Sequence, residues 1–345
     1  MESILYDILM VEKILVPELL PVFFRRYEIL NIISLNEPIG RRSISNILGL
    51  GEKIVRNEVA RLQEESLIYI NSQGMYVTDE GRNILKNAES WINKLKALDY
   101  TEKELAEFLS IRKVIIVSGN TKDPLHIKRM AGKKAAEHLK SILTEDMIVG
   151  ITGGTTMAAM AKEMPKANYS NKNITIVPAR GGLGVNAETQ ANNIAAVIAQ
   201  KLHCSYKLLH LTENLSKELL ETIKEYPEIK EILEYIKNLN ALVFGIGRAD
   251  VMFARRNLKK DRIEFLKGKG AVAEAFGYYF DEKGKIVDVV NTVGINLEQY
   301  YNLDHVIGVA TGVEKAQAIM AISKLNSNLV LIIDEALAGA ILETK

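Results

Sequence analysis

Seven short apolar runs, rich in valine, isoleucine and leucine, recur through the C-terminal part of the chain. Helical patterns separate most of them, and buried parallel strands that alternate with helices form a doubly wound sheet. The sequence therefore predicts a Rossmann-like α/β domain over residues 111–345, with ligands bound beyond the carboxyl ends of its strands. The predicted strands are residues 114–118, 147–152, 174–178, 206–209, 241–245, 306–310 and 329–333.

Turns that contain glycine follow four of these predicted strands. In one of them, Gly153 and Gly154 precede Thr155 and Thr156 at a helix start, where free N–H groups and threonine hydroxyls bind anions. Such a turn taken singly is equally well a tight connection, but its recurrence beside basic residues indicates an anion pocket that serves more than one phosphate. The candidate residues are Gly153, Gly154, Thr155, Thr156, Arg180, Gln190, Arg255 with Arg256 as its alternative, and Lys315.

Glu274 is an acid within an apolar and aromatic run, residues 271–279. An acid in such a run hydrogen-bonds a sugar hydroxyl, acts as a general base or pairs with a buried arginine, and the sequence leaves these three roles open. The turn after residue 150 breaks the Gly-x-Gly-x-x-Gly spacing, and the chain has no Walker A motif. We therefore expect neither a nicotinamide nor an ATP site, and no cofactor.

The first 80 residues carry a different pattern. Apolar residues recur at helical spacing over residues 23–35, 43–48 and 52–65, with Ser43 as the expected N-cap of the second helix and Gly49 as its end. Two short runs, 67–70 and 75–78, flank a turn sequence, as in a β-hairpin. This order predicts a winged helix-turn-helix, in which the helix at 52–65 enters the major groove of double-stranded DNA.

The charge of this region is local, because the whole chain has a net charge of only +1. Residues 1–80 carry a net charge of −4, whereas residues 40–61 hold five basic and two acidic residues, a net charge of +3. We expect DNA contacts from the polar face of the third helix and from the start of the second. These residues are Arg41, Arg42, Lys53, Arg56, Asn57 and Arg61; the alternative is a solvated helix face in an interaction domain.

A helical connector is predicted over residues 81–110, with a start at Thr78. Its apolar residues alternate gaps of four and three, as in a short coiled-coil seam, and predict a dimer contact. A single helix packed on its own chain is the alternative, since two heptads are too few to decide. The stripe consists of Ile84, Ala88, Trp91, Leu95 and Leu98.

Cys204 is the only cysteine, so no internal disulfide forms, and the histidines show no metal-binding spacing. No apolar run approaches the length of a membrane span, and the N-terminal segment lacks the basic start of a signal peptide. We therefore expect a cytoplasmic protein with no membrane partner and no metal.

The chain resembles the SorC family of bacterial sugar-responsive regulators in three segments that follow the predicted winged helix. These segments are residues 151–156, 178–184 and 312–316. The resemblance covers nearly the whole chain. It implies a repressor of glycolytic and sugar catabolic genes that forms homodimers or homotetramers on operator DNA. It also implies a sensor domain that is related to sugar-phosphate isomerases and glucosamine-phosphate deaminases but has no enzymatic activity. The expected effector is fructose 1,6-bisphosphate, with contacts from Thr155, Thr156, Arg180, Gln190, Arg255, Glu274 and Lys315.

Two other functions fit parts of the sequence. The first is a sugar-phosphate isomerase or deaminase with Glu274 or Asp250 as the acid/base group, against which the N-terminal helix-turn-helix argues. The second is a regulator of the same architecture that senses a nucleotide. Protection from thermal unfolding by sugar phosphates or by nucleotides distinguishes these regulators.

Overall fold

The structure is a computed structural model of the chain, and it describes residues 15–16, 18–119, 123–182, 186–211, 213 and 216–345. The chain forms two compact units. The first consists of Met1–Asp99 with Ser118–His126, and the second of Tyr100–Val117 with Ile127–Lys345. Among the described helices, none combines the length and the apolar composition that a membrane crossing requires.

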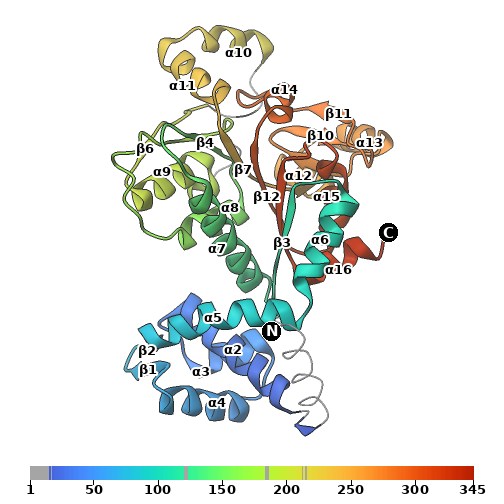
Figure 1. Cartoon of the computed structure of the whole chain (residues 1–345). Coiled ribbons are helices and arrows are strands. Elements are labelled where there is room, and N and C mark those ends of the chain that lie inside the picture. The colour runs from blue at the N-terminus through green and yellow to red at the C-terminus, as the bar shows by residue number, and fades with distance from the viewer. Residues whose placement is uncertain (1–14, 17, 120–122, 183–185, 212, 214–215) are drawn as a thin grey trace. The chain divides into compact units, whose positions relative to one another are not determined.

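The N-terminal unit contains the predicted helices and hairpin in the predicted order (Figure 1). Buried residues from all of these elements, among them Ile32, Ile44, Val59 and Met75, form one apolar core. Apolar burial of this kind is what stabilises short helices that are marginal on their own. The elements are α2 (Leu19–Asn36), α3 (Arg41–Leu48), α4 (Glu52–Glu64), β1 (Ile68–Asn71), β2 (Gly74–Val77) and α5 (Asp79–Leu95).

Helix α3 begins earlier than the sequence indicated. Its N-cap is Gly40, whose carbonyl already accepts hydrogen bonds from the N–H groups of Ser43 and Ile44. Ser43 therefore lies within the first turn, and its prediction as the N-cap was wrong. The predicted end is confirmed, because Gly49 has φ of 65° and its N–H bonds the Ser45 carbonyl.

The connector helix α5 begins as predicted, with the Thr78 hydroxyl accepting a hydrogen bond from Gly81 N–H. It ends at Leu95, and Ala97 with φ of 52° breaks the chain direction before α6 (Leu98–Leu109). Leu98 is therefore not on the same helix as the rest of the predicted stripe. On α5, Ile84 and Trp91 are exposed, whereas the buried apolar side chains are those of Leu85 and Ile92.

The second unit is built on a sheet of seven parallel strands. The chain runs from β4 outward through β5 to β6, returns to β7 on the other side of β4, and continues outward to β12. Strand order therefore reverses between β4 and β7, where such sheets open a crevice. In sheet order the strands are β3 (Lys113–Val117), β13 (Leu329–Asp334), β12 (His305–Val309), β7 (Ala241–Gly245), β4 (Ile148–Ile151), β5 (Thr175–Pro178) and β6 (Ser205–Tyr206).

Strand β6 is shorter than the predicted 206–209. The side chain of Asn192 accepts a hydrogen bond from Leu209 N–H at 2.9 Å and donates one to the Leu209 carbonyl at 3.0 Å. One amide side chain thus satisfies both backbone groups that a neighbouring strand otherwise pairs. The other six predicted strands are confirmed, with ends shifted by one residue at most.

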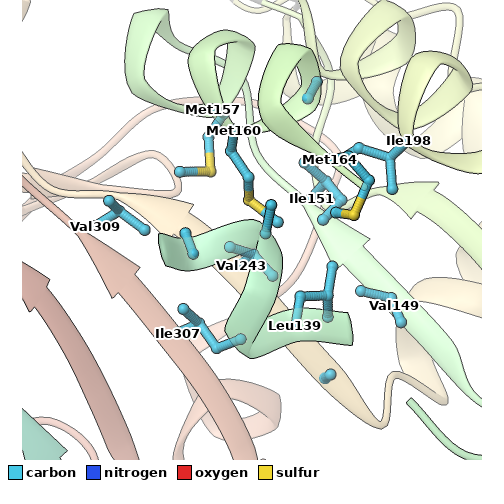
Figure 2. Close-up of a cluster of buried hydrophobic side chains, with 14 of the residues drawn as sticks. Leu139, Val149, Ile151, Met157, Met160, Met164, Ile198, Val243, Ile307 and Val309 are labelled. Carbon is cyan, nitrogen blue, oxygen red and sulfur yellow. The ribbon is translucent and has the colours of Figure 1, made fainter. Parts of the chain in front are cut away.

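Helices α7, α8 and α9 cover one face of this sheet. Figure 2 shows Leu139, Met160 and Ile198 in one cluster with the strand residues Val149 and Val243. The helices of the unit are α6, α7 (Pro124–Ile142), α8 (Thr155–Glu163), η1 (Ala187–Thr189), α9 (Ala191–Leu202), α10 (Lys217–Lys224), α11 (Pro227–Lys237), α12 (Ala249–Arg255), α13 (Lys260–Gly268), α14 (Leu297–Tyr301), η2 (Val313–Lys315), α15 (Ala316–Ser323) and α16 (Glu335–Leu342).

A second, antiparallel sheet is inserted in the chain between β7 and β12 (Figure 1). Its strands pair in the order β11, β10, β9, β8, and β9 carries Glu274. This insertion places a carboxylate of one sheet near residues that follow the strands of the other. Its strands are β8 (Gly247–Arg248), β9 (Ala273–Ala275), β10 (Tyr278–Phe280) and β11 (Ile286–Val289).

Candidate anion site and nucleic-acid interface

The turn between β4 and α8 has the geometry of an anion-binding helix start. Gly154 has φ of 120° and ψ of 163°, a conformation that is essentially restricted to glycine. Its N–H bonds the Thr189 carbonyl, and its own carbonyl accepts from Ala158 N–H at the first turn of α8. Among the described side chains, none caps this helix start. Its first N–H groups therefore point outward with partial positive charge, beside the exposed Thr155.

Lys128 lies at this helix start and is electrostatically coupled to a second lysine. Lys128 on α7 donates a hydrogen bond from Nζ to Thr155 Oγ1 at 3.2 Å. Lys315 is half-buried, and burial lowers its pKa from 10.5 to about 8, with the positive charges of Lys128 and Arg255 adding to the effect. The predicted residues Thr155, Arg255 and Lys315 thus lie in one electrostatic neighbourhood, in which an anion is favoured.

Arg180, by contrast, lies in a buried ion-pair network. It follows β5 and pairs with Glu213 and with Glu274, the latter at 3.2 Å between NH1 and Oε1. Arg256 binds the same two carboxylates, at 2.9 Å from Nε to Glu213 Oε2 and 2.9 Å from NH2 to Glu274 Oε1. Its NH1 also donates to the Tyr279 hydroxyl at 2.9 Å. Two guanidinium groups and two carboxylates therefore neutralise one another inside the unit.

Burial and charge shift the pKa values of this network in opposite directions. Burial lowers the pKa of Arg180 to about 10 despite the neighbouring Glu274. Burial raises the pKa of Glu274, but the charges of Arg256 and Arg180 outweigh it and hold that pKa below its ordinary value. Glu274 also accepts the Gly277 N–H at 2.9 Å. Of the three roles open to Glu274, pairing with buried arginines is the one that the structure contains.

The remaining predicted residues lie near the start of α8 or near the buried ion-pair network. Gly153 lies against η1, since a Cβ there would come within 2.8 Å of the Thr189 carbonyl oxygen and 3.9 Å of the Gln190 carbonyl carbon. Thr156 is buried within α8. Arg255 is exposed while its neighbour Arg256 is buried. Residues 183–184, the end of the segment that carried the family resemblance, lie outside the described residues.

Sequence reasoning missed three residues of these clusters: Lys128, Glu213 and Arg256 in its paired role. Glu213 and Arg256 are separated by 43 positions along the chain, and neither is part of a recognisable motif. Lys128 lies on a helix with several other lysines and no glycine-rich turn nearby in sequence. Only spatial proximity distinguishes it, so no sequence signal identifies it.

The N-terminal unit presents the predicted basic face of α4 to solvent. Lys53, Arg56, Asn57 and Arg61 are exposed, whereas Val55, Val59 and Leu62 on the other side of the helix are buried. Lys53 and Arg56 form no ion pair with any residue that the structure describes, while Arg61 bonds Glu65 at 2.7 Å. Arg41 and Arg42 are exposed on α3, and Arg42 lies 3.3 Å from Glu52.

One buried acid links α4 to α2. Glu58 accepts hydrogen bonds from Arg25 at 2.6 Å and from Arg26 at 2.7 Å, both on α2. Burial raises the Glu58 pKa, but the hydrogen bonds from Arg26 and Arg25 lower it further than burial raises it. The ionised carboxylate therefore ties α4 to α2 and leaves the opposite, basic face free.

Comparison with known proteins also divides the chain into a DNA-binding part and a sugar-binding part. Residues 22–92 match the CggR N-terminal DNA binding domain, and residues 93–343 match a family of sugar-binding domains. The central glycolytic genes regulator of Bacillus subtilis is 40% identical over 336 residues, which cover 97% of this chain and 98% of the relative. The regulator of that name from Priestia megaterium is 41% identical, over 95% of this chain and 96% of its own length.

A solved structure points to the same family. A SorC family transcriptional regulator from Enterococcus faecalis aligns with a TM-score of 0.66 and 37% identity, over 70% of this chain and 99% of that one. Both the DNA-binding and the sugar-binding part of the family are thus present, in the predicted order. The chain therefore belongs to the SorC family of transcriptional regulators, within the group of central glycolytic genes regulators.

Proposed function

We propose that this regulator represses glycolytic or other sugar catabolic genes and that fructose 1,6-bisphosphate controls its affinity for operator DNA. The observation that carries the proposal is the cation cluster beside the start of α8. The same chain presents Lys53 and Arg56 on α4 with no ion pair to any described residue. A doubly phosphorylated sugar supplies the negative charge that the cluster lacks. Two relatives at about 40% identity are both named central glycolytic genes regulator, which supports the choice of genes.

The proposed effector site has two parts. One phosphate binds Gly153, Gly154, Thr155 and Thr156 at the start of α8, with Arg255 and Lys315 as counter-charges. The rest of the sugar, with its second phosphate, extends toward Gln190, Arg180 and Glu274. The proposed sensor is related to sugar-phosphate isomerases in fold, and it occupies residues 111–345 behind a helical connector at 81–110.

The proposed DNA-binding part is a winged helix-turn-helix over residues 1–80. In this proposal α4 is the recognition helix, the β1–β2 hairpin is the wing, and homodimers or homotetramers bind operator DNA. The side chains of Lys53, Arg56 and Asn57 contact bases, and Arg41, Arg42 and Arg61 contact phosphates.

Two features support a regulator with no enzymatic activity. Glu274 and Asp250, the acid/base candidates of an isomerase, are both paired with arginines. Burial raises the pKa of Asp250, but the hydrogen bond from Arg248 lowers it below its ordinary value. Carboxylates with lowered pKa values remain ionised near neutral pH and are poor proton donors.

The decisive experiment uses DNA that the full-length protein selects from a random library. Fluorescence anisotropy measures its affinity for that DNA while fructose 1,6-bisphosphate, unphosphorylated fructose or ATP is added. Of these three compounds, we expect only fructose 1,6-bisphosphate to change DNA affinity. A change with ATP and none with the bisphosphate favours a nucleotide sensor, and turnover of a sugar phosphate favours the isomerase.

A further inference from the structure

We propose that Lys128 is a third cationic ligand of the anion site and contacts a phosphate group of the bound effector directly. This inference rests on the proposed function, because it concerns the same site. It adds a ligand from α7, a helix that contributes none of the other proposed effector contacts.

Packing between α7 and α8 positions this lysine. Gly132 on α7 approaches the α8 backbone so closely that a Cβ there would lie 2.7 Å from Met160 N. Lys128 is one turn before Gly132 on the same face of α7, and Thr155 is one turn before the Met160 region on α8. Across this contact, Lys128 Nζ reaches Thr155 Oγ1 at 3.2 Å.

A second contact holds the start of α7 in place. Arg129, the next residue, donates to Glu163 Oε1 at 2.8 Å from Nε and 2.6 Å from NH2. This ion pair, with two donors on one carboxylate oxygen, and the Gly132 contact are made by neighbours of Lys128. The Lys128 ammonium group is therefore not needed to join the helices. The ammonium group is thus free to serve a ligand.

The charges that surround Lys315 favour this role, because Lys128, which bonds Thr155, is one of them. Lys128, Lys315 and Arg255 contribute three positive charges, and Glu314 and Asp334 contribute two negative ones. Asp334 is already engaged, because it accepts the Gly312 N–H at 2.8 Å and caps α16. A phosphate dianion at the start of α8 compensates the excess positive charge and accepts hydrogen bonds from the ammonium groups.

The alternative is that Lys128 only links α7 to α8. Removal of a structural link lowers the stability of the unliganded protein and leaves ligand affinity largely unchanged. Removal of one of three neighbouring cations relieves repulsion, so the unliganded protein stays as stable or gains stability while ligand affinity falls. The two roles thus predict opposite outcomes in the absence of ligand.

The test compares full-length wild type with Lys128→Met and with Lys140→Met. The control changes the same net charge on the same helix, in its last turn. Calorimetry measures the affinity for fructose 1,6-bisphosphate, and thermal unfolding is followed without ligand and with inorganic phosphate as a second probe. We expect Lys128→Met to weaken bisphosphate binding by about tenfold to a hundredfold, the range of a charge-assisted hydrogen bond, with an unchanged or higher Tm of the unliganded protein.

Each other outcome contradicts a specific statement. If wild type binds the bisphosphate and Lys128→Met binds it equally well, the Lys128 role is wrong and the proposed function stands. If wild type responds only to inorganic phosphate and Lys128→Met abolishes that response, the anion site stands and the sugar effector is wrong. If neither anion protects wild type, both proposals fail. An equal loss of affinity in Lys140→Met indicates a general effect of net charge and also overturns the Lys128 role.

Discussion

Arg255 and Arg256 are neighbours in sequence with opposite environments. The Arg256 side chain is 1% exposed and binds two carboxylates and a tyrosine hydroxyl. Arg255 is exposed, and its charge lowers the pKa of Lys315. Because successive residues of a helix point about 100° apart, a shift of one position exchanges a buried, paired arginine for an exposed one. This distinction requires the structure, since either arginine satisfies the sequence pattern.

Lys315 predicts a pH dependence of effector binding. Its pKa in the unliganded protein is about 8, so the ammonium form dominates below that pH and the neutral amine above it. A bound phosphate dianion favours the ammonium form and raises this pKa, so binding takes up a proton between the two values. We expect affinity to fall as pH rises above about 8, by at most about tenfold per pH unit.

Calorimetry in two buffers of different ionisation enthalpy checks this proton uptake directly. Lys315→Met should bind weakly at every pH and show no buffer-dependent difference in heat. A wild-type affinity that stays constant between about pH 7 and pH 9.5 would exclude Lys315 as a charged ligand at this site.

Arg180→Ala should destabilise the sensor unit as well as weaken effector binding. The substitution leaves Glu213 and Glu274 buried with Arg256 as their remaining guanidinium partner in the described network. Breaking a buried ion pair from one side costs about 3–5 kcal/mol, because an uncompensated charge remains. Urea unfolding of the unliganded protein measures this cost. A loss below about 0.5 kcal/mol, the range of ordinary surface substitutions, would show that the network contributes little to stability.

At the scale of elements, the strands were predictable from the sequence, but the side chain that shortens β6 was not. Strongly apolar runs identified six strands to within one residue, because a parallel strand buried on both faces carries a continuous apolar signal. The shortened β6 depends on the side chain of Asn192, which lies 17 positions from its partner Leu209. Local pattern contains no information on such a pairing.

The candidate site likewise contains residues that the sequence predicts and residues that only the tertiary fold identifies. Gly153, Gly154 and Thr155 were predictable, since a strand, a glycine turn and a helix follow one another in sequence. Lys128 and Glu213 come from other elements and required the tertiary fold. The prediction that Arg180 binds the effector remains a prediction. In the unliganded structure its guanidinium is paired with two acids.

Helix α4 makes a testable prediction about DNA recognition. Arg56 is exposed on α4, whereas its neighbours Val55 and Val59 are buried. Arg56→Ala should therefore cost about 1–3 kcal/mol if Arg56 contacts a base, and should relax specificity at one position. Arg42→Ala should weaken all sequences alike and flatten the salt dependence, as expected of a phosphate contact. Anisotropy titrations with the selected DNA and single-base variants measure both effects. Operator binding that survives both substitutions unchanged would contradict the winged-helix interpretation.

At the scale of the whole molecule, the effector acts on DNA binding only if the two ligands prefer different states of the regulator. The linkage is then reciprocal, so bound operator changes effector affinity by the same factor. The connector α5 is the element that suits such a role. Its Trp91 is 51% exposed and its Ile84 41% exposed, an apolar stripe on a helix whose inward positions are Leu85 and Ile92.

Exposed apolar residues at helical spacing are expected to pair with a second copy of the chain. If this contact transmits the effector signal, replacement of both Trp91 and Leu95 by alanine should reduce a coupling free energy on the order of 1–3 kcal/mol toward zero. Effector affinity of the DNA-free protein should change little. Lys86→Ala, at an exposed position of the same helix, serves as the control. Sedimentation and anisotropy on the operator complex, with and without saturating sugar phosphate, measure assembly and coupling together. Full coupling in the Trp91/Leu95 double variant, with unchanged assembly, would place the signal path outside this stripe.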